Sequence, residues 1–353
     1  DLSHCNGYST SGSSGVPLTV LRSREAMMYD PGMMRLMAER HDIPLELSPD
    51  RPAIFFFVDL ENYGCLYQRI AMLDLGEYYR FGLGSPSWDG PMHMLEFLTT
   101  WPGAVLSSNP QSLTRLLEFY DEEDPKGEYP LRPAFVLSGG AELTDGQAKK
   151  FSDFFQAPVI DSYGTVETGV VGFQCAKSRA FHVEENVAIV ECLDPEGKPV
   201  PDGEVGEIVL TDLRNPEFPM IRYRIGDFGS VAGGRCECGS YAMRILTLDG
   251  RTNTHFYTNA GKKVIPAGLN RDMRPLPIYQ FQVEQRALDE FVVRYIPTEE
   301  AGVSTEELNR ELQQIFKRVF GEATKTECQF VSRLGEPGRK VHAYISSMED
   351  VPL

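Results

Sequence analysis

The sequence predicts an α/β fold that changes to a β-rich subdomain at about residue 180 and ends in a small α+β domain. Three observations lead to this prediction. Strand-like apolar runs alternate with helical patterns in the first half, which is typical of parallel strands linked by helices. Short β-like pieces with Gly and Pro turns follow. From about residue 250, strand patterns accompany one long amphipathic helix.

The first half of the chain alternates helix and strand signals. Residues 22–40 have the apolar spacing of a helix, with a break expected near Pro31 because proline removes a helical hydrogen bond. Short apolar runs of the length of buried strands follow, and amphipathic segments separate them. The predicted strands are 53–60, 104–108, 134–138 and 158–162, and the predicted helices are 111–120 and 144–155.

The second half predicts mostly strands and one clear helix. The helix at 305–320 begins after Ser304, and Glu307 completes a capping box with it. Because the pattern of strand and helix signals changes again near residue 250, we predict a core of residues 1–249 and a C-terminal domain of residues 250–353. The predicted strands of this half are 182–193, 206–213, 280–283, 291–296 and 327–331.

Composition excludes several classes of function. The 353 residues carry 34 Lys and Arg against 51 Asp and Glu, a net charge of −17, which argues against nucleic acid or an anionic membrane as a general partner. No stretch approaches the roughly 20 apolar residues of a membrane span, and the start lacks the pattern of a signal peptide. Seven cysteines without a dense framework favour a reducing compartment, and we expect a cytoplasmic protein.

Residues 9–17 are dense in glycine and hydroxyl side chains. Consecutive amides in such a loop form a concave anion site suited to phosphate. The loop is not a Walker A motif, because Ser13 follows where Gly-Lys-Ser/Thr would be required. A flexible Ser/Gly linker has the same composition, so both interpretations stay open.

Residues 160–168 follow a predicted strand, at the position where α/β sheets bind ligands. An aromatic ring, a glycine turn, a hydroxyl and a carboxylate occur together here, a set able to stack on a base, contact a phosphate and hold Mg²⁺. The alternative is a turn with a solvated glutamate. Further along, the carboxylate of Asp227 is able to accept hydrogen bonds from both hydroxyls of a ribose.

Five segments in a fixed order give the sequence a family resemblance. They are T-S-G-S-S-G-V-P at 10–17, S-G-G-A-E-L at 138–143, D-S-Y-G-T-V-E at 161–167, R-Y-R-I-G-D at 222–227 and G-R-T at 250–252. In these segments the chain resembles the adenylate-forming superfamily of acyl-CoA ligases, and within it the phenylacetate-CoA ligase branch. The resemblance implies the architecture of these enzymes and a reaction in two steps. A carboxylate first attacks the α-phosphate of ATP, and a nucleophile, typically a thiol, then displaces AMP.

The resemblance also implies roles for individual residues. Tyr163 stacks on adenine next to Gly164, Thr165 contacts the α-phosphate, and Glu167 holds Mg²⁺. The remaining implied contacts are the phosphate loop of Ser11, Gly12, Ser13, Ser14 and Gly15, the adenine and acid sites of Gly139, Gly140, Ala141 and Glu142, and the ribose contacts of Asp227 and Arg251.

The family also has a lysine near its C-terminus that reaches the substrate carboxylate and the α-phosphate. The matching segment here is 335–340, with Lys340 as the first candidate and Arg339 as the alternative, because Arg339 separates the expected Gly-Lys pair. If Lys340 has this role, the C-terminal domain is mobile and swings between the two half-reactions.

A separate group consists of Cys175, His182, Cys236 and Cys238. Two cysteines one residue apart in a glycine-bounded loop, with a Cys-x6-His upstream, supply four ligands for tetrahedral Zn²⁺. Reduced core cysteines are the alternative, and the resemblance to a zinc-bearing region of the branch favours the metal. With all four positions filled by protein, such a zinc is structural.

The acid and the acceptor are the least determined features. Phe81 lies in a segment resembling the aryl pocket of the branch, where Gly84 replaces a bulkier residue and suggests a widened pocket for an aromatic acid. The acceptor thiol is CoA or the phosphopantetheine arm of an acyl carrier protein. Alternatives are an amide-forming ligase, acyl transfer to a protein cysteine, and a catalytically inactive, zinc-stabilised scaffold. The oligomeric state stays open, with a dimer as one option, and so does whether the N-terminus is complete.

Overall fold

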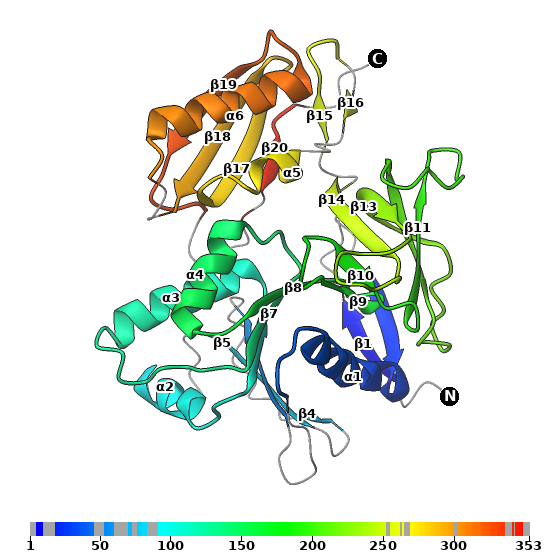
Figure 1. The fold of residues 1–353 in the computed structure, drawn as a ribbon, viewed down its shortest axis with the longest axis vertical. Coiled ribbons are helices and arrows are strands. Elements are labelled where there is room, and N and C mark those ends of the chain that lie inside the picture. The colour runs from blue at the N-terminus through cyan, green and yellow to red at the C-terminus, as the bar shows by residue number, and fades with distance from the viewer. Residues whose placement is uncertain are drawn as a thin grey trace.

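The structure is a computed structural model that describes residues 5–9, 18–45, 53–59, 70–72, 76–82, 91–251, 255–261, 263–264, 269–298, 302–335, 341 and 343–348. Figure 1 shows a large sheet with helices against it and a smaller sheet near the top of the view. The predicted mixed α/β fold class is confirmed by this arrangement.

Within the described residues, twelve strands form one continuous sheet. In spatial order they are β11 (Ala188–Leu193), β12 (Val205–Asp212), β13 (Tyr223–Ala232), β14 (Arg244–Arg251), β10 (Phe181–Val183), β9 (Gly169–Gln174), β8 (Val159–Thr165), β7 (Phe135–Gly139), β6 (Val105–Ser108), β3 (Ala53–Asp59), β5 (Gly76–Gly82) and β4 (Ile70–Met72).

This sheet has a parallel half and an antiparallel half. The strands β5, β3, β6, β7 and β8 pair in parallel. From β8 through β9, β10, β14, β13 and β12 to β11, every pairing is antiparallel. The β-rich region predicted from about residue 180 therefore begins already at Gly169, and it continues the main sheet instead of forming a separate one.

Helices cover both faces of the parallel half. On β7, Phe135 and Leu137 pack with the cluster that includes Met37, whereas Val136 packs with the cluster that includes Phe151. This alternation follows from the period of two in a strand, which sends neighbouring side chains to opposite faces. The helices are α1 (Arg24–Arg40) on the first face and α2 (Pro91–Thr99), α3 (Pro110–Glu123) and α4 (Asp145–Phe155) on the second.

The break predicted near Pro31 is wrong, because α1 runs without interruption from Arg24 to Arg40. A proline inside a helix removes one hydrogen bond, and the bonds on either side can carry the helix past it. The buried side chains of Met33 and Met37 anchor the C-terminal half of α1 on the sheet. The N-terminal hairpin of β1 (Cys5–Ser9) and β2 (Thr19–Ser23) leads into this helix.

A four-stranded sheet and two helices form what we call the C-terminal unit. Helix α6 spans Thr305–Phe320, as predicted, and its capping box of Ser304 and Glu307 is present. Its apolar face, with Leu312 and Phe316 fully buried, packs on the sheet. The other elements are α5 (Leu269–Met273), β17 (Ile278–Ala287), β18 (Glu290–Pro297), β19 (Lys325–Phe330) and β20 (Tyr344–Ser346), with the small hairpin β15 (Phe256–Tyr257) and β16 (Lys263–Val264) nearby.

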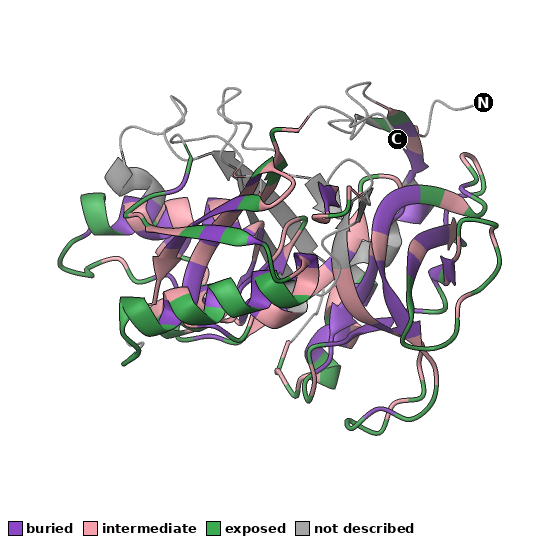
Figure 2. Cartoon of the chain, turned by 90° about the horizontal axis from the view of Figure 1, so that it is seen from above, coloured by how far each residue is buried: buried purple, intermediate pink, exposed green. Residues whose placement is uncertain are grey.

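The predicted domain boundary at residue 250 falls inside β14, where Arg251 pairs with Asp227 of the large sheet. We call the twelve-stranded sheet with α1–α4 the core. The mobility of residues 250–353 as a domain stays a prediction. Figure 2 shows buried residues concentrated in the strands and exposed residues along the loops and outer helix faces. In the part of the chain that the structure describes, no helix combines the length and apolar character required to cross a membrane.

Candidate active site

A cavity of about 530 Å³ lies where the core meets the C-terminal unit. The core side includes the loop after β7, the end of β8, and Asp227 on β13. The C-terminal unit contributes Arg274, Gln280 and Phe281 from the start of its sheet. The carboxyl ends of parallel strands are where α/β sheets bind ligands, so the cavity has the position expected of an active site.

Glycines shape the loop between β7 and α4. A Cβ atom on Gly139 would lie 2.5 Å from Ser162 Oγ and 3.2 Å from Ser162 O, so β7 and β8 leave little room for a side chain at this point. Gly140 turns the chain with φ +74°, a conformation that favours glycine. Thr144 then caps α4, and Gln147 completes its capping box. Residues 140–142 therefore line the cavity directly before a capped helix.

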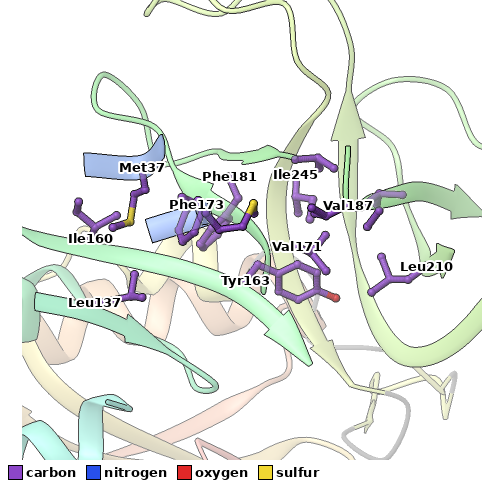
Figure 3. Packing of buried hydrophobic residues seen from close by; sticks show 14 of the residues in the cluster. Met37, Leu137, Ile160, Tyr163, Val171, Phe173, Phe181, Val187, Leu210 and Ile245 are labelled. Carbon is purple, nitrogen blue, oxygen red and sulfur yellow. The ribbon is translucent and has the colours of Figure 1, made fainter. Parts of the chain in front are cut away.

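Tyr163 and Asp227 meet across the core side of the cavity. The Tyr163 hydroxyl donates to Asp227 Oδ2 at 2.9 Å, and both residues are buried. The Tyr163 ring also lies 6.4 Å from the ring of Phe181, centroid to centroid, at an angle of 56°, and Figure 3 shows this packing. In the strand register, Asp227 is opposite Arg251. The structure thus brings together three residues that the sequence assigned to adenine and ribose.

Thr165 and Glu167 lie in and just after the end of β8, beside the cavity and not among its lining residues. The Thr165 hydroxyl accepts from the backbone N–H of Thr168 at 3.1 Å, which fixes the turn to β9. Tyr223 donates from its hydroxyl to Glu167 Oε1 at 3.4 Å. Both predicted residues therefore have defined orientations next to the cavity.

Of the other predicted residues, Gly140, Ala141, Glu142 and Gly164 line the cavity, and Gly139 does not. The backbone of Phe81 lies in β5 and that of Arg251 in β14. Several predictions fall outside the described residues, namely Ser11, Gly12, Ser13, Ser14, Gly15, Gly84, Arg339 and Lys340.

Four charged residues of the cavity had no predicted role, namely Asp145, Asp161, Arg179 and Arg274. Burial raises the pKa of the Asp161 carboxyl to about 7, although Arg274, the backbone N–H of Ser162 and Arg179 each act to lower it. Arg274 Nη2 lies 3.8 Å from Asp161 Oδ2, which is ion-pair range but too long for a hydrogen bond. The same Nη2 atom is buried without a hydrogen-bond partner. Asp161 is the first residue of the D-S-Y-G-T-V-E segment and could have been found there, whereas no motif surrounds Arg274.

The four cysteine and histidine residues form a second site, and none of them lines the cavity. The ligand atoms of Cys175, His182, Cys236 and Cys238 all lie within 4.8 Å of one another. The sulfurs of Cys175 and Cys236 are 3.7 Å apart, and Cys238 Sγ is 3.2 Å from His182 Nε2. The close pairing of β9 and β10 holds His182 here, because a Cβ on Gly172 would lie 2.4 Å from His182 O.

This geometry fits a tetrahedral zinc. With Zn–S bonds of about 2.3 Å, neighbouring sulfurs of a tetrahedron are about 3.8 Å apart, close to the 3.7 Å between Cys175 and Cys236. Burial, together with the charges of Arg40, Arg244 and His41, lowers the pKa of His182, which favours the neutral imidazole that binds metal. The donor set and its spacing both match a structural zinc.

Comparison with known proteins shows which family the chain belongs to. A family model described as AMP-binding enzyme matches residues 8–213. The chain is 26% identical over 226 residues to a phenylacetate-coenzyme A ligase of Thermus thermophilus, which corresponds to 62% of this chain and 47% of that protein. It is 28% identical over 125 residues to a phenylacetate-coenzyme A ligase of Pseudomonas putida, or 34% of this chain and 28% of that protein. The chain thus spans about half the length, or less, of these curated relatives.

Similarity to a solved structure confirms the predicted adenylate-forming architecture of the fold. The crystal structure of 2-hydroxyisobutyryl-CoA ligase in the postadenylation state, in complex with R3-HIB-AMP, superposes with a TM-score of 0.67 at 17% identity. The match covers 98% of this chain and 74% of the other. The predicted resemblance of the chain to the adenylate-forming superfamily is confirmed. Because the family model covers more than half of its residues, the chain belongs to the AMP-binding enzyme family.

Proposed function

We propose that this protein is an ATP-dependent, AMP-forming ligase that joins a carboxylic acid to a thiol. The observation that carries the proposal is the Tyr163–Asp227 pair at the cavity, beside the backbone of residues 140–142. An aromatic ring and a buried carboxylate beside a glycine turn together suit an adenosine. The relatives named as phenylacetate-coenzyme A ligases support the same reaction class.

In the first step, a carboxylate oxygen of the acid attacks the α-phosphorus of ATP and pyrophosphate leaves. Tyr163 would stack on the adenine, while Asp227 and Arg251 would bind the ribose from neighbouring strands. The hydroxyl of Thr165 would contact the α-phosphate. The phosphate loop, residues 11–15, would bind the leaving phosphates through backbone amides, and Lys340, or Arg339 in its place, would neutralise the charge at the reacting oxygens.

In the second step, a thiol sulfur attacks the carbonyl carbon of the acyl-adenylate and AMP leaves with the bonding electrons. CoA is the first candidate for the acceptor, and the phosphopantetheine arm of a carrier protein is the second. For the acid we propose an aromatic carboxylate, on the names of the relatives and on the segment that contains Phe81 and Gly84. Hydrolysis of free acyl-adenylate is avoided only if the cavity stays closed between the steps.

The proposed enzyme would bind two kinds of metal ion. Glu167, held by the Tyr223 hydroxyl, would bind Mg²⁺, and this ion would neutralise phosphate charge as pyrophosphate departs. The cluster of Cys175, His182, Cys236 and Cys238 would hold a structural zinc, because its four protein ligands leave no open position for substrate.

The exchange of labelled pyrophosphate into ATP tests the first step without knowledge of the acceptor. We expect exchange with aromatic acids, and its loss on Glu167→Gln, which removes the metal-binding charge and preserves the shape of the side chain. Reactions without acid control for contaminating activities. Absence of exchange with every aryl and alkyl acid would refute the proposed activity, and exchange with alkyl acids alone would refute the aromatic substrate.

A further inference from the structure

The C-terminal unit contacts the core in several places, and the contact beside the cavity lies at the N-terminal half of α4. Tyr279, at the start of β17, is the central residue of this contact. Its backbone carbonyl accepts from Thr144 Oγ1 at 2.7 Å, and its hydroxyl is 2.8 Å from Thr114 Oγ1 on α3. Lys150 Nζ lies 5.1 Å from the centre of its ring. Two helices of the core therefore hold both the backbone and the side chain of this tyrosine.

The contact also requires a glycine in the first turn of α4. A Cβ on Gly146 would lie 2.8 Å from Ile278 O, 3.1 Å from Tyr279 Cα and 2.5 Å from the methyl group of Thr298. Two of these atoms belong to the backbone of β17, so they cannot rotate away. The helix and β17 are thus in contact through the bare backbone of Gly146.

An ion pair borders the same contact. Asp145 accepts from Arg274 Nε of the C-terminal unit at 3.3 Å and from Arg179 Nη2 of the core at 2.6 Å. Arg274 also faces the buried Asp161 at 3.8 Å. One carboxylate therefore binds one arginine from each side of the cavity, and both arginines line it.

We propose that this surface, formed by Thr114, Thr144, Gly146 and Lys150, is a docking seat that positions the C-terminal unit over the cavity. Gly146 and Tyr279 are its positioning residues. When the seat is occupied, Arg274, Gln280 and Phe281 form one side of the cavity, and when it is vacated that side is lost. The seat thereby determines whether the cavity exists as an enclosed ligand site.

At residue 146, helix propensity favours alanine, whereas contact with β17 requires glycine. Alanine stabilises a helix relative to glycine, so Gly146→Ala favours the core by itself. The added methyl group is incompatible with β17 in its docked position. Gly146→Ala should therefore disturb the docking of the C-terminal unit without destabilising the core, which makes it a selective test of the seat.

The matched control is Gly32→Ala in α1. Gly32 is also a helical glycine, and nothing lies within 4 Å of the Cβ it would gain. Both variants gain helix propensity, but only Gly146→Ala blocks the seat. Small-angle scattering reports the separation of core and C-terminal unit, and amide hydrogen exchange reports protection of residues 276–281.

We expect Gly146→Ala to increase the radius of gyration and to speed exchange at residues 276–281 by about tenfold or more. Gly32→Ala should match the wild type in both measurements, and α6 should keep its protection in all three proteins. If Gly146→Ala matches Gly32→Ala in scattering and in exchange, the seat does not position the C-terminal unit.

The link to ligand binding rests on the proposed function and is measured separately, by titration with ATP. We expect Gly146→Ala to weaken ATP binding by about tenfold while Gly32→Ala leaves it unchanged. Equal ATP affinity in an undocked Gly146→Ala protein would overturn the claim that the seat encloses the ligand site. Failure of ATP to bind the wild type would refute the proposed nucleotide site, and the scattering result would still decide whether the seat exists.

Discussion

The cavity has two sides that differ in how they are held. On the core side, which we call the fixed wall, Tyr163 and Asp227 are hydrogen-bonded within one continuous sheet. On the other side, the docked wall, Arg274 and Phe281 belong to the C-terminal unit, whose contacts with the core include Tyr279. Disrupting the fixed wall requires breaking strand pairing within one sheet, whereas removing the docked wall requires only that side-chain and surface contacts between two units separate. The fixed wall is thus suited to recognise the ligand, and the docked wall to enclose it.

The largest expected effect concerns the Cys/His cluster, which supports the fixed wall. His182 is adjacent to Phe181, and Phe181 lines the cavity and packs near Tyr163. We expect Cys236→Ser to release zinc and to lower the free energy of unfolding by about 5 kcal/mol or more, since structural zinc contributes directly to folding. Metal content by mass spectrometry and chemical denaturation measure the two effects.

Cys328 is the control for this experiment, because it lies in the C-terminal unit and outside the cluster. The variant Cys328→Ser should retain the zinc content of the wild type. Wild-type protein purified without zinc, and unaffected by a chelator, would contradict the prediction.

The next effect is the pH dependence of stability that Asp161 imposes. Its pKa rises from 3.8 to about 7 on folding because the carboxyl is buried, so the folded state binds this proton more tightly than the unfolded state. The stability that the group contributes is therefore complete below 3.8 and is lost as the pH rises through about 7. Between about pH 4 and about pH 8, Asp161→Asn should gain roughly 4 kcal/mol of stability relative to the wild type.

Urea denaturation across this range measures the difference between the two proteins. Near the acid end both side chains are neutral and of similar shape, so the variant and the wild type should then have similar stability. A difference that stays constant with pH would show that Asp161 does not titrate in this range.

A third prediction concerns ligand recognition by two residues of the fixed wall, Asp227 and Tyr163. Asp227→Ala removes the acceptor of the Tyr163 hydroxyl and the proposed acceptor for the ribose hydroxyls. Two hydrogen bonds to a charged group are worth about 3 kcal/mol, so kcat/KM for pyrophosphate exchange should fall about a hundredfold. Tyr163→Phe, which removes one hydroxyl and keeps the ring, should lose about tenfold or less. Equal losses in the two variants would mean that Asp227 acts only by holding Tyr163.

The two walls also differ in how far the sequence could predict them. Tyr163, Gly140 and Asp227 lie in short segments in or directly after strands, where the local chemistry leaves a recognisable pattern. Arg274, Gly146 and Tyr279 have no such pattern, because their roles arise only when segments more than a hundred residues apart come into contact. Helix α6 was predicted to the residue because its capping box and apolar spacing are local signals. The uninterrupted α1 was not predicted, because packing on the sheet outweighs the cost of Pro31.

The smallest expected effect tests a single hydrogen bond of the docked wall. Tyr279→Phe removes the contact between the tyrosine hydroxyl and Thr114 Oγ1 without adding any atom. Burial raises the pKa of Tyr279 to about 12, so the hydroxyl keeps its proton at neutral pH and the effect should not vary there. One such bond contributes about 1 kcal/mol, which corresponds to about fivefold faster hydrogen exchange at residues 276–281. Thr114→Val removes this bond and also the bond from Thr114 Oγ1 to Pro110 O within α3, so its effect on exchange should be at least as large. Adding Tyr279→Phe to Thr114→Val should then cause no further change. Additive effects in the double variant would show that the two residues act independently, and the docked wall would then be held by the remaining contacts of the seat.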